Sequence, residues 1–113
     1  NAGGVSPIAF FKCRSVTTLL FPTGLRVIDQ SAFQYCSSLI CVDFPNDCEL
    51  QELGCAAFHS CTALVAIDLR PCRSLRSIGD YAFQKCDSLA SIGWPRALKT
   101  LGDEAVPAAS RMV

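Results

Sequence analysis

The chain has 113 residues, of which 50% are hydrophobic and 18% are charged. This length and this apolar content are enough for one domain with a continuous apolar core. The charges of ten basic and ten acidic side chains cancel to a net charge of zero. This argues against nucleic-acid binding driven by counterion release and against attraction to an anionic membrane. No run of about eighteen apolar residues is present, so we expect no membrane span.

A five-residue motif, Ala-Phe-x-x-Cys, recurs at residues 9–13, 32–36, 57–61 and 82–86. Successive Phe residues of these copies are 23, 25 and 25 positions apart. A decayed copy follows near residues 105–113, with Ala109 in the Cys position. Self-similarity at such a period is the sequence signature of stacked repeats. We therefore expect one domain over residues 1–113, with about four repeats of 23–25 residues and a degenerate terminal repeat.

The segment after each Cys predicts a short strand. It reads Leu-x-x-Ile-x-Leu or a close variant, and the alternating apolar residues suit a strand with one buried face. Proline ends this segment in three units, because it lacks the backbone donor that a sheet needs; these are Pro22, Pro45 and Pro95. In the third unit Arg70 stands before Pro71, so we expect that strand to end one residue later.

A second extended piece and a bend complete each unit. An apolar pair follows the proline, as at Leu75 and Ile78, and a glycine comes next in three units: Gly54, Gly79 and Gly102. We expect the chain to bend there into the Ala-Phe segment, as one turn of helix or as a tight turn. The second and third units carry two extra residues, near 46–49 and 71–74, and these insertions should stack on one another.

Stacking must create the core, because no single unit can cover its own apolar face. We expect Phe33, Phe58 and Phe83 to form a continuous interior column. Trp94 takes a position held by Phe or Leu in other units, so we expect it in the core rather than in a binding hot spot. The repeated cysteines should form a ladder of buried thiols that act as small hydrophobic groups: Cys13, Cys36, Cys61 and Cys86.

The Ala-Phe-x-x-Cys motif joined to Leu-x-x-Ile-x-Leu-Pro resembles the BspA-type, or Treponema-type, leucine-rich repeat, from Val5 to about Met112. Asp29 in the glycine position, the two longer units and the decayed last copy depart from the pattern. The resemblance implies an α/β repeat solenoid, a right-handed coil with short parallel strands on its concave face and short helical or turn segments on its convex side. It also implies recognition of a protein or surface without catalytic residues, often at the cell surface or after secretion.

Four cysteines fall outside the repeated position: Cys41, Cys48, Cys55 and Cys72. Cys48 and Cys72 lie in the two insertions that we expect to stack, about one strand spacing of 4.8 Å apart. A disulfide between them is our most specific covalent hypothesis, and it requires an oxidising compartment. Cys41 should face outward on its strand, and Cys55 sits at the glycine bend. No Cys-x-x-Cys pair is present, so we expect no structural zinc.

The sequence offers no set of residues that indicates catalysis or cofactor binding. A Cys/His nucleophile would need His59 beside Cys55 or Cys61. His59 instead fills a freely varied position, which favours a solvated side chain; the other units hold Phe11, Gln34 and Gln84 there. With no phosphate-binding glycine loop or paired-carboxylate pocket either, we expect a protein that is not an enzyme and takes no cofactor or metal.

Equivalent positions of a solenoid line up as ladders, so candidate partner-binding residues are read across the repeats. The first outward row of the strands consists of Thr18, Cys41, Ala66 and Ser91. The second consists of Leu20, Asp43, Asp68 and Gly93. The second extended segment adds a mostly basic row: Arg26, Gln51, Arg76 and Lys99.

Each row has two interpretations. Asp43 and Asp68 are adjacent like charges, which costs stability unless a cation or solvent relieves them. They are either a contact for a partner or two hydrated carboxylates. The basic row could bind an acidic protein surface, or it could only keep one edge of the solenoid solvated.

Two functions follow from these patterns. The first is a recognition module that presents the strand face to a protein or glycan. The second is a structural subunit, wedged as a rigid spacer among neighbouring subunits of an organellar or intracellular complex. The second draws support from the ends, since residues 105–113 are apolar and resemble no polar cap. Either further repeats flank the segment or its ends dock on a partner, and a chain that begins with Asn1 is expected to be a processed product or a fragment.

Overall fold

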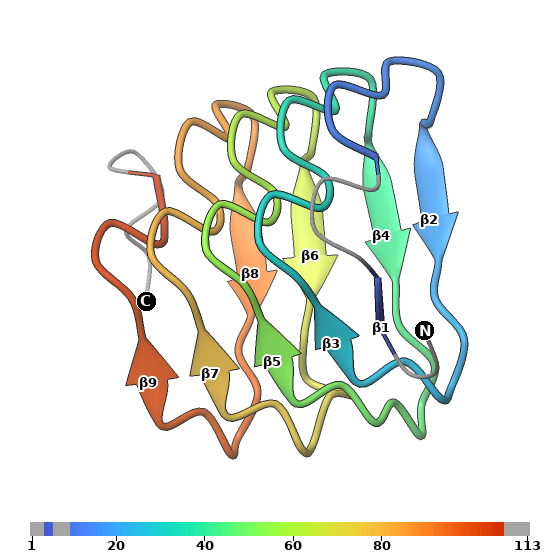
Figure 1. Cartoon of the computed structure of the whole chain (residues 1–113), viewed down its shortest axis with the longest axis vertical. Helices are drawn as coiled ribbons and strands as arrows, with labels where there is room; N and C mark the ends of the chain where they lie inside the picture. Colours follow the sequence, from blue (N-terminus) through green and yellow to red (C-terminus); the bar gives the residue numbers. More distant parts are fainter. Residues whose placement is uncertain (1–3, 6–9, 108–113) are drawn as a thin grey trace.

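The computed structural model describes residues 4–5 and 10–107 as two parallel β-sheets joined by short loops (Figure 1). One sheet has the strand order β1-β3-β5-β7-β9 and the other the order β2-β4-β6-β8. The strands of the first sheet are β1 Gly4–Val5, β3 Val27–Ile28, β5 Glu52–Leu53, β7 Ser77–Ile78 and β9 Thr100–Leu101. Those of the second are β2 Thr18–Leu20, β4 Cys41–Asp43, β6 Ala66–Asp68 and β8 Ser91–Gly93.

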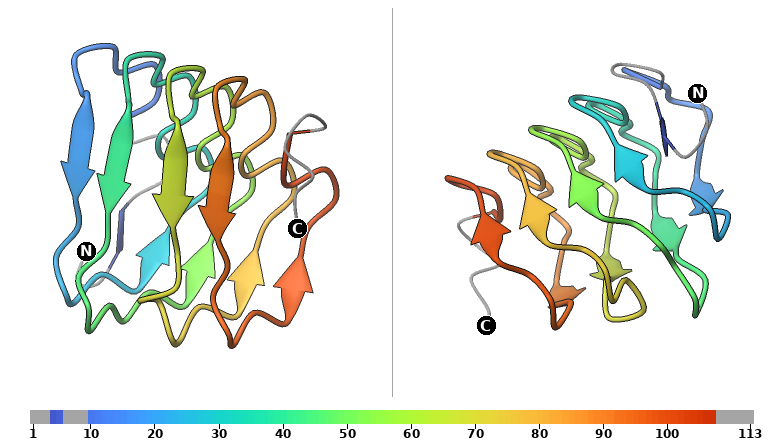
Figure 2. Two further views of the ribbon diagram at one scale, coloured as in Figure 1. Left: turned by 180° about the vertical axis from the view of Figure 1, so that it is seen from behind. Right: turned by 60° about the horizontal axis from the view of Figure 1, so that its bottom comes forward.

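Each repeat contributes one strand to each sheet, so the chain winds as a parallel β-solenoid, and Figure 2 shows the successive rungs side by side. The register follows the repeat length. Val42 of β4 pairs with Leu19 of β2 on one side and with Ile67 of β6 on the other. In the other sheet Leu53 pairs with Ile28 and with Ile78. The extended pieces predicted after the prolines are therefore strands, and they form a sheet separate from that of the Leu-x-x-Ile-x-Leu strands.

The phenylalanine column of the core is confirmed. The rings of Phe33 and Phe58 stack with centroids 5.3 Å apart, and those of Phe58 and Phe83 with centroids 5.7 Å apart. All three side chains are at most 1% exposed. Phe10 extends the column by stacking on Phe33 at 5.1 Å, although 41% of it is exposed at the end of the stack. Identical rings packed face over face explain why the motif repeats this residue.

The parallel-strand repeat solenoid is confirmed, but the helical part of the α/β expectation is wrong, because none of the described residues is helical and the Ala-Phe segments are turns. Two residues have positive φ in each of the three Ala-Phe segments that are described in full, as at Ser31 (58°) and Tyr35 (65°), and such residues interrupt a right-handed helix. Within the turn the N–H groups of Gln34 and Cys36 donate to carbonyls three residues earlier, and the alternate N–H groups donate to the next rung. That of Phe33 donates to the carbonyl of Ala57, and that of Tyr35 to the carbonyl of His59.

The ladder of buried thiols is confirmed for three of the four cysteines in the repeated position. Cys36, Cys61 and Cys86 are fully buried, whereas Cys13 at the end of the stack is half-buried. Burial raises the pKa of Cys61, and it raises the pKa of Cys86 to about 12. These thiols therefore stay protonated and act as core groups.

The third unit does not extend its strand as expected. β6 ends at Asp68, in the same position as β4 at Asp43 and β8 at Gly93. Arg70 leaves the sheet and turns back, because its backbone N–H and its guanidinium both donate to the Asp68 carboxylate. Of the degenerate terminal repeat, residues 108–113 lie outside the described residues, so its extent stays a prediction.

Candidate functional site

The outer face of β4, β6 and β8 carries a shallow hollow of about 400 Å³. Six of the eight residues predicted for the two strand rows line it: Cys41, Asp43, Ala66, Asp68, Ser91 and Gly93. Thr18 and Leu20 of β2 are exposed beside them, since they pair in register with Cys41 and Asp43, but they do not line the hollow. The structure thus places the two rows on one continuous face, which we call the strand face.

The two aspartates of the strand face are not equivalent. Asp68 accepts two hydrogen bonds from the Arg70 guanidinium, at 2.8 Å on Oδ1 and 3.1 Å on Oδ2. Arg70 therefore holds the pKa of the Asp68 carboxyl below its usual range. Gly93 makes room for this pair, because a Cβ there would clash with Oδ1 of Asp68. Of the two carboxylates predicted to repel each other, Asp68 is thus paired with a cation of the chain itself, and the repulsion itself stays a prediction.

Sequence reasoning missed an apolar margin of the strand face. Ile40 and Val65 come directly before β4 and β6, and 52% and 48% of their side chains are exposed. Backbone hydrogen bonds link them, since the N–H of Val65 donates to the carbonyl of Ile40 and that of Ala90 to the carbonyl of Val65. The signal was present, because two β-branched apolar residues share one position in adjacent units.

The predicted basic row also forms, on the other sheet. Its residues come directly before β3, β5, β7 and β9, and their backbones are joined rung to rung. The N–H of Gln51 donates to the carbonyl of Arg26 at 2.7 Å, and the N–H of Lys99 to that of Arg76 at 2.8 Å. The Arg26 side chain forms an exposed ion pair of 3.6 Å with Glu49. The basic row therefore belongs to a different sheet from the strand face.

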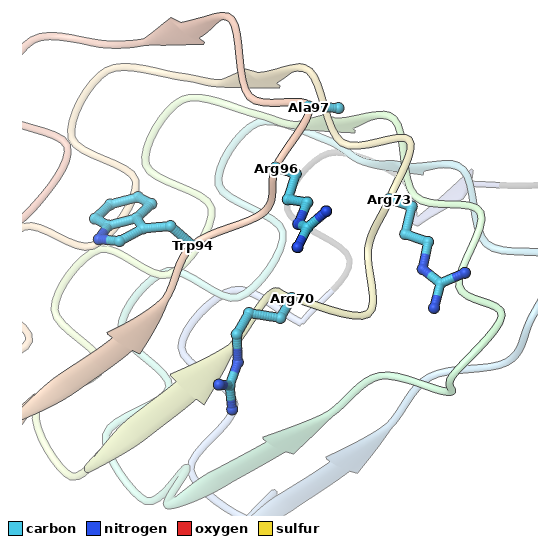
Figure 3. A pocket seen from close by; sticks show the side chains of 5 residues that line it. All are labelled: Arg70, Arg73, Trp94, Arg96 and Ala97. Atoms are coloured by element: carbon cyan, nitrogen blue, oxygen red, sulfur yellow. The ribbon is translucent and has the colours of Figure 1, made fainter.

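A cavity of about 760 Å³ lies where the loops after β6 and β8 run side by side (Figure 3). It is lined by Arg70, Arg73, Trp94, Arg96 and Ala97, and we call it the arginine cavity. The repeat pattern indicated Arg70 only as the residue at a strand end, and it did not indicate Arg73 or Arg96. The sequence shows only that Arg70 and Arg73 flank Pro71-Cys72 and that Arg96 follows Pro95 in the next unit, and no repeat row contains the three arginines together.

Trp94 takes part in both environments that were weighed for it. Its side chain is partly buried and packs against the core cluster, as expected for a position that holds Phe or Leu elsewhere. It also lines the arginine cavity, where Figure 3 shows the indole on the side of Arg96 away from Arg73. The assignment of Trp94 to the core alone is therefore incomplete.

The residues weighed for catalysis have structural contacts. The Cys61 thiol donates to the backbone carbonyl of Phe33, while Cys55 is exposed at the bend. His59 is half-buried rather than solvated: its Nδ1 lies 2.9 Å from the Ser60 hydroxyl, and its ring contacts Tyr35 edge to face. Burial lowers the pKa of His59. Within the described residues no group of His, Cys, Asp or Glu could hold a metal ion, and no helix could cross a membrane.

The two stacked insertions meet at their cysteines. Cys48 and Cys72 are buried, and their sulfur atoms lie 3.3 Å apart as free thiols. Desolvation, followed by the contact with Cys48, raises the pKa of Cys72. The predicted proximity is confirmed, and the disulfide itself stays a prediction.

Comparisons with known proteins agree with this architecture. The family model for the BspA type leucine rich repeat region matches residues 4–110 with six copies. A leucine-rich repeat protein from Bacteroides ovatus is 26% identical with a TM-score of 0.67, covering 88% of this chain and 30% of that one. A T. pallidum leucine-rich repeat protein is 22% identical with a TM-score of 0.46, covering 96% of this chain and 73% of that one. No curated protein matches.

This chain thus spans less than a third of the Bacteroides ovatus protein. The family match covers nearly the whole chain, and it agrees with the parallel rungs, the phenylalanine column and the thiol ladder described above. The chain belongs to the BspA-type leucine-rich repeat family.

Proposed function

We propose that the chain is a non-catalytic protein-binding module that engages its partner through the strand face. Leucine-rich repeat folds commonly mediate protein–protein interaction and generally act without catalysis. The observation that carries the proposal is the hollow of about 400 Å³ across three adjacent strands. The contact residues are those of the two strand rows, Thr18, Leu20, Cys41, Asp43, Ala66, Asp68, Ser91 and Gly93.

The chemistry of the strand face suits a protein ligand. Small side chains such as Ala66 and Ser91 let a partner approach the sheet closely. Leu20, which is 73% exposed, and Ile40 offer apolar area to bury. The Asp68–Arg70 pair at the far end of the strands gives a polar edge with fixed geometry. The strand face thus offers both apolar area and fixed polar groups, and protein interfaces bury both kinds of surface.

The basic row forms a second, weaker candidate contact on the other sheet: Arg26, Gln51, Arg76 and Lys99. Arg76 and Lys99 are exposed, and no described carboxylate lies within ion-pair distance of either. They would attract an acidic partner surface and raise its association rate, an effect that salt weakens.

The test uses two matched substitutions. Ser91→Arg places a long cation on the strand face, whereas Ser88→Arg makes the same change at an exposed position outside β8. Immobilised wild-type chain and both variants are incubated with an extract of the source, and the retained proteins are quantified by mass spectrometry. We expect a partner that wild type and Ser88→Arg retain equally and Ser91→Arg loses by about tenfold or more, equivalent to at least about 1.4 kcal/mol. A partner set unaffected by Ser91→Arg would rule out the strand face.

Size-exclusion chromatography with light scattering separates this function from that of a rigid spacer. A recognition module should run as one soluble species of about 12.2 kDa. A subunit that needs neighbours to cover its apolar edges would aggregate when isolated.

A further inference from the structure

We propose that the arginine cavity binds a short acidic segment of a protein, whose carboxylates pair with Arg73 and Arg96 while an apolar group of the segment packs on Trp94. The inference deepens the proposed function and rests on it, because it names the chemistry of the protein ligand. The site lies at the loop edge of the solenoid. It shares Arg70 with the hollow of the strand face, but none of the eight residues of the strand rows lines it.

The cavity has rigid walls, because each arginine adjoins a buried anchor. Cys72, beside Arg73, is fully buried, and its N–H donates to the carbonyl of Leu69. Pro95, beside Arg96, is also buried. The N–H of Leu69 donates to the carbonyl of Gly93 at 2.8 Å, which joins the two loops at the point where they leave the sheet. The arginines therefore project from fixed backbone.

The three arginines of the cavity differ in whether a carboxylate of the chain pairs with them. Arg70 donates two hydrogen bonds to the Asp68 carboxylate, so its charge is already paired and its side chain is held in place at the edge of the cavity. Arg73 and Arg96 have no carboxylate of the described residues within ion-pair distance, and Figure 3 shows both guanidinium groups extending from adjacent loops in the same direction. A guanidinium group can donate two parallel hydrogen bonds to one carboxylate, which fixes the geometry of the pair.

The surroundings favour a short acidic segment over a long polyanion. Residues 43–52 hold four acidic side chains and no basic one, whereas residues 70–76 hold three arginines and no acidic residue. The two loops of these stretches adjoin, since Cys48 contacts Cys72. A polyanion that continued past the cavity would therefore meet Asp47 and Glu49, which are exposed. A peptide with a few adjacent acidic residues fits without this repulsion, and the chain's zero net charge gives a long polyanion no compensating attraction.

Trp94 provides the readout, because it is the single tryptophan of the chain and lines the cavity. The full chain is titrated with an unlabelled hexaglutamate peptide at low ionic strength, with tryptophan emission as the signal. We expect a saturable change that weakens as salt is added. A hexalysine peptide should give no change. Absence of a saturable change with hexaglutamate up to millimolar concentration would overturn the proposal.

The variants keep the total charge change equal. Arg73→Gln/Arg96→Gln should weaken hexaglutamate binding by about tenfold or more. Lys12→Gln/Arg14→Gln removes the same charge from exposed positions outside the cavity and should leave the affinity within about twofold. Circular dichroism checks that both variants are folded. Equal loss in the two variants would mean that hexaglutamate responds to overall charge, and the site would be rejected.

A second ligand distinguishes an acidic peptide from an anionic glycan as the natural ligand of the cavity. A heparin-derived tetrasaccharide that binds more tightly than hexaglutamate, with the same dependence on Arg73 and Arg96, would replace the acidic peptide by an anionic glycan and overturn the proposal. The strand face is tested independently. If hexaglutamate fails while Ser91→Arg still abolishes capture of the partner, only the arginine cavity is rejected. If hexaglutamate binds but Ser91→Arg has no effect on capture, only the strand face is rejected.

Discussion

The thiol of Cys61 donates a hydrogen bond of 3.2 Å to the backbone carbonyl of Phe33, 28 residues earlier in the chain. The same contact joins Cys36 to Phe10 and Cys86 to Phe58, at 3.1 Å each. Cysteine in this position is thus both a small apolar group and a donor that links one rung to the preceding one. Alanine and valine have no side-chain donor and could not make this link.

Replacing Cys61 by alanine should therefore destabilise the fold. The carbonyl of Phe33 keeps a second donor, the N–H of Cys36 at 3.2 Å, so the loss is one weak hydrogen bond and the volume of the sulfur atom. We expect Cys61→Ala to lower the free energy of unfolding by about 1–2 kcal/mol, measured by urea denaturation. Cys55→Ala, at an exposed cysteine, should change it by less than about 0.5 kcal/mol. Equal effects of the two substitutions would contradict a role for the thiol ladder.

Gly79 marks a point of close backbone approach between rungs. A Cβ at this position would lie 2.5 Å from the backbone nitrogen of Cys55 and 2.8 Å from the carbonyl carbon of Gly54. Because backbone cannot rotate away as a side chain can, we expect Gly79→Ala to destabilise the fold by about 1–3 kcal/mol, seen as a lower midpoint of urea unfolding.

Gly24 supplies the control for this substitution. Nothing lies within 4 Å of a Cβ built there, so Gly24→Ala should be neutral or slightly stabilising, since alanine restricts the unfolded chain. If both variants unfold at the same urea concentration, the glycine position is not a steric requirement of the repeat.

Cys48 and Cys72 should form a disulfide when the protein matures in an oxidising compartment. Their sulfur atoms are 3.3 Å apart in the interior, and the bond forms as the two thiols give two hydrogens to an oxidant such as glutathione disulfide. Alkylation in denaturant without reductant, followed by mass spectrometry, should then find six modified cysteines and one crosslinked Cys48–Cys72 peptide. Eight alkylated cysteines in material from such a compartment would disprove the pairing.

The sequence predicted most of the fold because the repeat itself encodes it. The Phe column, the buried thiols, the two extended pieces per unit and the proximity of Cys48 and Cys72 all follow from one register. The helical option for the Ala-Phe segment failed because periodicity cannot distinguish a turn of helix from a tight turn. The positive φ angles of Ser31 and Tyr35, neither of them glycine, carry no compositional signal.

The candidate sites also differ in whether the repeat register predicts them. Residues inside the repeat register, such as Ala66 and Ser91, were placed on a common face because ladders follow from stacking. The arginine cavity was missed because Arg70, Arg73 and Arg96 occupy different positions of their units and meet only through loop geometry. A row-by-row comparison of repeats cannot bring such residues together.

The Asp68–Arg70 pair gives a prediction for acid titration. Arg70 donates to both carboxylate oxygens, so the pKa of Asp68 in the folded chain lies below the unfolded value of about 3.9. The stabilisation from the pair is therefore complete above that value and is lost as the pH falls through the folded-state pKa. Carboxyl-carbon NMR should show that Arg70→Gln raises the pKa of Asp68, whereas Arg73→Gln changes it much less. A pKa that is unmoved by Arg70→Gln would show that the fork does not persist in solution.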